Sequence, residues 1–113
     1  KICVIHTGRW NSFEGPDFLE AIIEMDGRRL VGSVEIHFKA DDWYAHRHES
    51  NPLYRDVILH VVLFKPKSNA SYVYFSDQAI ETLTLMQPNQ INHLDVLPMF
   101  HLPELPHAPN YHC

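Results

Sequence analysis

Apolar and polar residues alternate along much of the first 64 positions, and this alternation predicts a body built mostly of β-strands. The apolar runs Ile2–His6 and Phe18–Met25 are the first two expected strands. The second run ends at Asp26-Gly27, a dipeptide typical of a tight hairpin turn. Residues 30–39 are therefore expected to form the returning strand of a hairpin.

The expected strand at residues 30–39 has two different faces, because successive side chains of a strand point to opposite sides. One face is mostly apolar and is expected to pack in the core. The other contains Glu35, His37 and Lys39, and is expected to carry the chemistry. The plain alternative is that Glu35 and Lys39 lie on the solvated side of a two-faced sheet.

The later elements are less uniform. Residues 41–56 are polar and aromatic, and are expected to form a loop with one helical turn after Asn51-Pro52. Val57–Phe64 is rich in β-branched residues, which predicts a buried central strand. Residues 71–75 are an expected strand after a turn at Ser68-Asn69, whereas residues 79–86 are compatible with a strand or a helix.

The last sixteen residues, 98–113, contain a proline every three to five positions, so they are expected to form an extended tail, and they resemble the edge of a larger protein. The predicted organisation is a single β-rich domain over residues 1–97 followed by this tail. The fold class is mainly β or α+β, with an antiparallel or mixed sheet and few short helices.

Charge and cysteine content exclude several classes of protein. The net charge is −5 and no long basic stripe occurs, which argues against tight nucleic-acid binding through many phosphate contacts. An apolar run of eight residues interrupted by His60 is too short for a transmembrane helix, so a cytoplasmic protein without membrane contact is expected. Cys3 and Cys113 are either reduced or joined end to end.

Histidine is unusually frequent, since nine histidines equal the number of Lys and Arg residues together. Carboxylates and imidazoles are the ligands of Zn²⁺, Mn²⁺ and related ions, so this excess predicts a site for a divalent metal ion: Zn, Mn or Mg. Trp43 and Tyr44 are expected to stack on a ring or base of the substrate. The candidate metal ligands are Asp17, Glu35, His37, His46, His48 and His60, of which Asp17, Glu35 and His37 are also the candidate catalytic residues.

Each of these residues also has an ordinary structural interpretation. His60 in an apolar strand is compatible with a core histidine that bonds to the backbone, although burying it without a partner would cost a few kcal/mol. His46 and His48 lie near Arg47 and Glu49, as they would on a solvated loop. The conjunction of four histidines with two carboxylates favours the metal site.

Two resemblances bear on function. Pro16-Asp17, followed by Glu35-x-His37, resembles the hairpin of PD-(D/E)xK nucleases, except that His37 stands where those enzymes have lysine. This likeness implies carboxylates that hold a metal ion beside a phosphodiester.

A second resemblance covers more of the chain. The strings GPDF, GSVEIH, DWYAHRH and VILHVV are similar to the hallmark of a widespread bacterial family of unknown function. This resemblance implies that nine residues belong to one shared constellation: Asp17, Glu35, His37, Asp42, Trp43, His46, His48, Tyr54 and His60.

The favoured hypothesis is a metal-dependent hydrolase that acts on a phosphodiester or nucleic-acid substrate. A bound ion would lower the pKa of a water, and an unligated Glu or His would take its proton. The alternatives are a non-catalytic β-rich binding or structural domain of a larger protein, and a module whose histidines change charge between pH 7 and 5.

Overall fold

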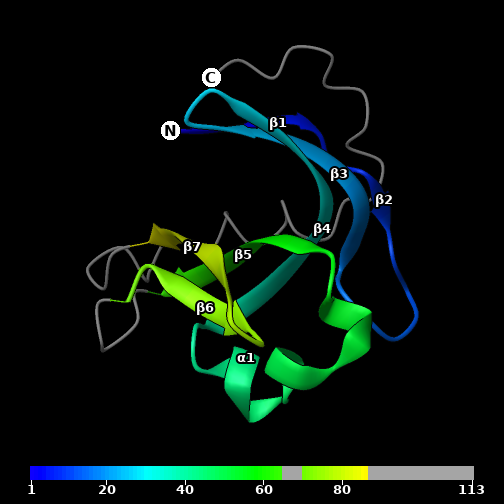
Figure 1. Ribbon diagram of the computed structural model, residues 1–113, viewed down its shortest axis with the longest axis vertical. Helices are drawn as coiled ribbons and strands as arrows, with labels where there is room; N and C mark the ends of the chain where they lie inside the picture. The colour runs from blue at the N-terminus through cyan, green and yellow to red at the C-terminus, as the bar shows by residue number, and fades with distance from the viewer. Residues whose placement is uncertain (65–69, 87–113) are drawn as a thin grey trace.

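The computed structural model describes residues 1–64 and 70–86, which form one curved, mixed β-sheet (Figure 1). The strands are β1 (Ile2–His6), β2 (Arg9–Trp10), β3 (Phe18–Met25), β4 (Arg28–Lys39), β5 (Val57–Phe64), β6 (Tyr72–Phe75) and β7 (Gln78–Met86). Their order across the sheet is β1-β3-β4-β5-β7-β6, and the short β2 pairs with β3. The mainly β class with a mixed sheet is therefore confirmed. The expected turn at residues 68–69, the tail at 98–113 and Cys113 lie outside the described residues.

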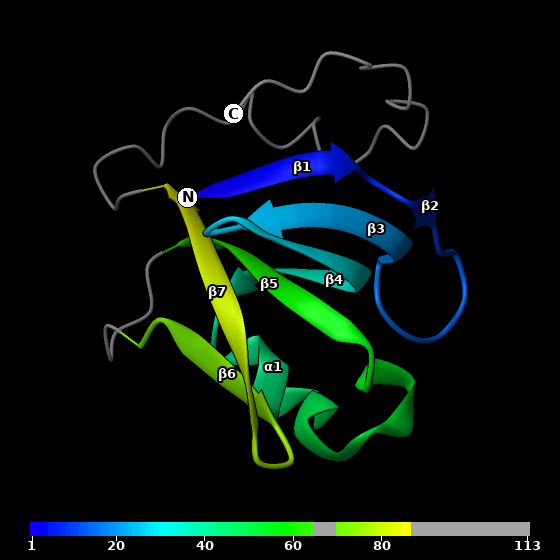
Figure 2. The ribbon, with the colours of Figure 1, turned by 45° about the horizontal axis from the view of Figure 1, so that its top comes forward.

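The predicted hairpin joins β3 to β4. Asp26 and Gly27 have φ angles of 52° and 83°, the left-handed conformation that two-residue hairpin turns require at both positions. Antiparallel pairing then runs back from Met25 opposite Arg28, and β1 lies antiparallel to β3 on the other side. Figure 2 shows these strands side by side at the top of the molecule.

In the middle of the sheet, β5 pairs in parallel with β4 on one side and with β7 on the other. Parallel neighbours need a crossover connection. Between β4 and β5 this connection is the crossover segment, residues 40–56, which contains α1 (Asp42–Ala45), η1 (His48–Ser50) and η2 (Pro52–Tyr54). The register of the two parallel pairs places Glu35, His60 and Thr82 opposite one another in a single row.

The crossover segment agrees only in part with the expected loop. The helical turn after Asn51-Pro52 is confirmed as η2, whose first turn is capped by the Asn51 side chain accepting from Leu53 N at 3.0 Å. The sequence pattern did not reveal α1 or η1. Residues 79–86 fall in β7, which resolves the choice between helix and strand in favour of strand.

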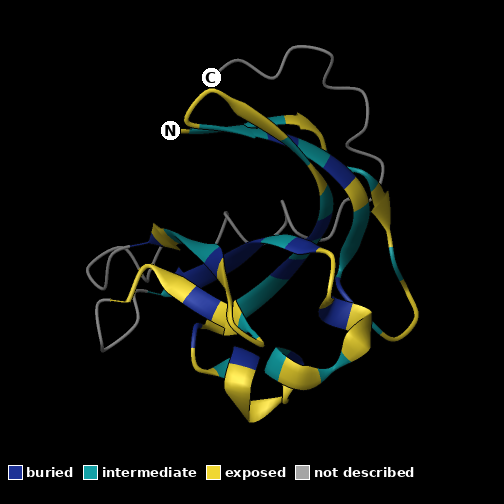
Figure 3. Cartoon of the chain, viewed as in Figure 1, coloured by how far each residue is buried: buried dark blue, intermediate teal, exposed yellow. Residues whose placement is uncertain are grey.

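The sheet is buried on both sides in its middle (Figure 3). One core cluster contains Ile23, Leu59 and Val61, and the other contains Trp43, Tyr54, Val57, Val73 and Ile80. β5 is buried along nearly its whole length, which confirms the predicted central strand. The crossover segment covers the polar face of β4, so Glu35 is only 5% exposed and does not lie on a solvated side of the sheet.

The crossover segment also contacts β6, the strand at the end of the sheet order. The Tyr74 amide donates to the Tyr44 hydroxyl at 3.0 Å, and the Tyr74 carbonyl accepts from Trp43 Nε1 at 2.9 Å. The Ser76 amide donates to the Glu49 carbonyl at 2.9 Å. Among the described residues, no helix is long and apolar enough to span a membrane.

Candidate metal centre

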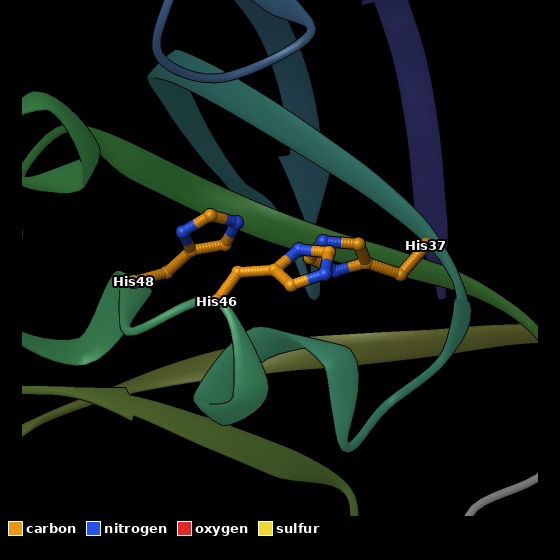
Figure 4. Close-up of side chains that lie close together, drawn as sticks. All are labelled: His37, His46 and His48. Carbon is orange, nitrogen blue, oxygen red and sulfur yellow. The ribbon is translucent and has the colours of Figure 1, made fainter.

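Three of the predicted ligands converge. Ring nitrogens of His37, His46 and His48 all lie within 4.8 Å of one another. His37 comes from β4, whereas His46 follows α1 and His48 begins η1 (Figure 4). His46 is exposed and His48 is buried, so the cluster runs from the surface into the molecule.

The backbone between His46 and His48 explains why their rings meet. Two residues at this spacing would place both rings on one side of an extended chain, but the chain here is not extended. His46 ends α1, Arg47 adopts a left-handed conformation with φ of 59°, and η1 begins at once. This sharp turn brings the two ring centroids to 5.5 Å, with His48 directed inward.

Glu35 is the buried carboxylate of the cluster. Its Oε2 atom lies 3.1 Å from Nε2 of His37 and 3.1 Å from Nε2 of His48. Its other oxygen, Oε1, is buried with no hydrogen-bond partner, as is Nδ1 of His48. Buried polar atoms are normally satisfied, so these two mark a place where the polar network is incomplete.

Asp17 lies beside Glu35, as predicted for two carboxylates of one site. It immediately precedes β3, and its Oδ2 atom accepts a hydrogen bond from Ile36 N at 2.8 Å. Burial and then the negative charge of Glu35 raise the pKa of Asp17 to about 6. Asp17 is not one of the three converging residues, but its carboxylate interacts electrostatically with His37.

His60 lies behind His37 and does not join the other three histidines. Its Nε2 atom is 2.8 Å from His37 Nδ1, and its Nδ1 atom is 3.5 Å from the Thr82 hydroxyl. Burial, followed by repulsion from His37 and His48, lowers the pKa of His60 to about 3, so the ring is neutral. The core histidine has polar side-chain partners, as its burial required.

Aromatic rings pack around the cluster. Tyr54 stacks on His48 with centroids 3.7 Å apart, and Trp43 meets His48 and His60 at 5.3 and 5.2 Å. Trp43 is 0% exposed, so it has no free ring face for a substrate and its observed part is to pack the histidines. Tyr44 is 43% exposed and keeps an accessible surface.

Burial also shifts the pKa values of His48 and Tyr54. Burial lowers the pKa of His48, and the attraction of Glu35 opposes that shift. Burial and the charges of Glu35 and Asp17 raise the pKa of Tyr54 to about 12, so its hydroxyl stays protonated. Tyr54 was not among the predicted site residues, and the signal that pointed to it was its place in the family-like constellation.

The donor set fits a transition-metal ion. Neutral imidazoles are ligands of Zn²⁺, Mn²⁺ and Fe²⁺, and three histidines leave a position for water, as in catalytic zinc sites. Mg²⁺ prefers oxygen ligands, so it fits these three nitrogens worst among the expected ions. Glu35 Oε2, at 3.1 Å from Nε2 of His37 and of His48, adds an oxygen donor beside these nitrogens.

A separate groove of about 560 Å³ lies where β3, β4 and β5 come together near the start of β5. Its charged lining residues are Arg9, Glu20, Arg55 and Asp56, and Arg9 is paired with Glu20 at 2.7 Å. None of the three converging histidines lines it. The groove is therefore not part of the metal centre.

Comparison with known proteins identifies a family whose function is not known. A family model described as "Protein of unknown function (DUF2851)" matches residues 1–98. No curated protein and no solved structure matches the chain. The expectation of a family of unknown function is confirmed at that level.

Proposed function

Because the chain belongs to the DUF2851 family, which is described only as proteins of unknown function, its activity has to come from the site, and we propose that it is a metal-dependent hydrolase. The observation that carries the proposal is the convergence of three histidine nitrogens within 4.8 Å beside the buried carboxylate of Glu35. The ring nitrogens come from one strand and from two turns of the crossover segment, so the fold itself assembles the ligand set.

Each residue has a defined part. His37, His46 and His48 hold the ion, which when bound acts as a Lewis acid and lowers the pKa of a water toward neutrality. Glu35 would serve as the proton acceptor for a water there, since its Oε2 atom lies 3.1 Å from Nε2 of His37 and of His48. Asp17 adds negative charge that favours a bound cation. The exposed ring of His46 marks the side from which a substrate approaches.

A phosphodiester is the substrate class that we favour. Its support is the meeting of Asp17 and Glu35 at neighbouring strands, the arrangement expected from the resemblance to the nuclease hairpin. With a net charge of −5 the protein repels polyanions at long range, so the ion has to be the main attraction for a phosphate. Tyr44 is the accessible aromatic ring for contact with a base.

The test combines metal content, stability and activity. Elemental analysis of purified protein is expected to find close to one transition-metal ion per chain. After chelation, added Zn²⁺ or Mn²⁺ should raise the melting temperature, because an ion at one hundred times its Kd stabilises by about 2.7 kcal/mol. The loaded protein should hydrolyse bis(4-nitrophenyl) phosphate. His46→Ala should abolish all three results, while His6→Ala, at an exposed histidine outside the cluster, should change none of them.

One observation favours a second candidate, the non-catalytic β-rich binding domain. Glu35, His48 and His60 are buried and bonded to neighbouring side chains, which also describes a polar core. In that case the purified protein contains no metal, Zn²⁺ and Mn²⁺ leave its melting temperature unchanged, and His46→Ala has no effect.

A further inference from the structure

A row of polar contacts leads from the metal centre into the sheet. His37 Nε2 lies 3.1 Å from Glu35 Oε2, and His37 Nδ1 lies 2.8 Å from His60 Nε2. The row ends at Thr82, whose hydroxyl is 3.5 Å from His60 Nδ1. It crosses β4, β5 and β7, and it exists because the parallel register places Glu35, His60 and Thr82 opposite one another.

The chemistry of each group fixes the direction of these bonds in the metal-free protein. A carboxylate oxygen only accepts, so the proton of the first contact sits on His37 Nε2. His37 Nδ1 is then an acceptor, and His60 donates to it from Nε2. The Thr82 hydroxyl in turn donates to His60 Nδ1. Every hydrogen bond along the row then has one donor and one acceptor, with each donor on the Thr82 side and each acceptor on the Glu35 side.

A metal ion at His37 Nε2 requires the opposite direction. The ion takes the nitrogen lone pair, so the ring proton has to reside on Nδ1, from which it is donated to His60 Nε2. His60 then carries its proton on Nδ1 and donates it to the Thr82 oxygen. A hydroxyl can serve both states because it both donates and accepts.

We propose that His60 and Thr82 are positioning residues for the metal ligand His37, and that metal binding reverses the hydrogen-bond direction along Thr82, His60 and His37. This inference rests on the proposed metal centre. The protons balance as follows: one leaves His37 Nε2 for solvent, His60 passes its Nε2 proton to His37 Nδ1, Thr82 passes its proton to His60 Nδ1, and the half-buried hydroxyl regains one from water.

Nitrogen-15 NMR of the imidazole rings tests the reversal directly, since it distinguishes the two tautomers of a neutral histidine. In the metal-free protein we expect the proton of His37 and that of His60 on Nε2, and after addition of Zn²⁺ both on Nδ1. Identical tautomers with and without bound Zn²⁺ would overturn the proposal, as would a metal-free His37 protonated on Nδ1.

The failures of this inference and of the proposed function are distinguishable. If Zn²⁺ does not bind, the metal centre and the reversal fail together, and the metal-free spectrum still decides whether the row of contacts exists. If Zn²⁺ binds and the tautomers do not change, only the positioning role fails.

Substitutions at Thr82 give an independent measurement. Thr82→Val leaves the His60 Nδ1–H of the metal-bound state without an acceptor, and buried N–H groups without partners are rare. We expect Zn²⁺ affinity about tenfold weaker, within the range for the loss of an outer-shell partner. Thr82→Ser should restore it. Thr84→Val makes the same change two residues along β7, opposite Val62, and should leave affinity unchanged. Equal affinities for the two valine variants would overturn the proposal, provided that their metal-free melting temperatures agree.

Discussion

Asp17→Asn is expected to stabilise the metal-free protein at pH 7.5, although it changes a residue of the candidate site. The carboxylate of Asp17 is partly buried against that of Glu35, and both effects oppose its ionisation. Asparagine removes the negative charge but keeps an oxygen in place to accept the bond from Ile36 N, which is 2.8 Å long in the wild type. The substitution therefore removes the cost of ionising a carboxyl group that is partly buried and lies beside Glu35.

The magnitude follows from the pKa. A rise from the ordinary value of 3.8 to about 6 corresponds to about 3 kcal/mol at 1.36 kcal/mol for each pKa unit. Asp17 is only partly buried, and solvent screening reduces the effect, so we expect a gain of about 1–2 kcal/mol. A gain of that size would raise the melting temperature of a domain of this length by about 4–16 °C.

The pH dependence has a defined sign. Because the folded-state pKa of Asp17 is raised, its favourable contribution is complete below about pH 3.8 and is lost as the pH rises through about 6. Urea unfolding with a chelator present, at pH 4 and pH 7.5, should show the two proteins close in stability at the lower pH and Asp17→Asn ahead at the higher.

Two results would refute this reasoning. A variant less stable than the wild type at pH 7.5 would mean that the Asp17 carboxylate makes a net favourable interaction in the metal-free protein. A stability difference independent of pH would mean that charge is not its origin. With saturating Zn²⁺ the advantage should shrink or reverse, because the bound cation gains from the charge of Asp17.

Three further predictions concern single side chains. His46→Ala should leave the metal-free melting temperature within about 2 °C of the wild type, since this ring is exposed, and should abolish the Zn²⁺-induced rise; a rise that persists in calorimetry would exclude His46 as a ligand. Trp43→Ala should cost about 3–5 kcal/mol in urea unfolding, because the ring is fully buried, and a loss below 1 kcal/mol would contradict its packing role. Gly32→Ala should destabilise by more than 1 kcal/mol, since its Cβ would lie 2.5 Å from the Asp56 carbonyl oxygen; unchanged unfolding would show that the two strands can move apart.

Most strands and the polar face of β4 could be predicted from the sequence, because alternation and turn residues are local signals. The two-residue β2 was not predicted, and the residues of β7 were also compatible with a helix. The parallel pairing of β5 with β4 and β7 could not be predicted, since it depends on contacts between residues far apart in the chain. For the same reason the sequence indicated that His60 needs a polar partner without identifying His37 and Thr82.

Among the site residues, Trp43 shows most clearly what local pattern cannot supply. It lies in a polar stretch of sequence, and there an aromatic ring is easily interpreted as substrate-facing. The chain buries it because α1 places it over the sheet, where its Nε1 atom donates to the Tyr74 carbonyl. The three converging histidines were among six candidate ligands chosen by residue type, whereas the left-handed turn at Arg47 that brings two of them together could not be predicted.

The contacts between the crossover segment and β6 limit how the centre can open. An uncovered edge strand offers its free amides and carbonyls to other chains and promotes aggregation. Here Trp43 and Tyr44 bond to Tyr74 of that edge, and Glu49 bonds to Ser76 just after it, all from the same segment that carries His46 and His48. Lifting the segment to admit a substrate would expose the edge to self-association. A cluster that is reached beside the exposed ring of His46, with the segment left in place, keeps the edge covered.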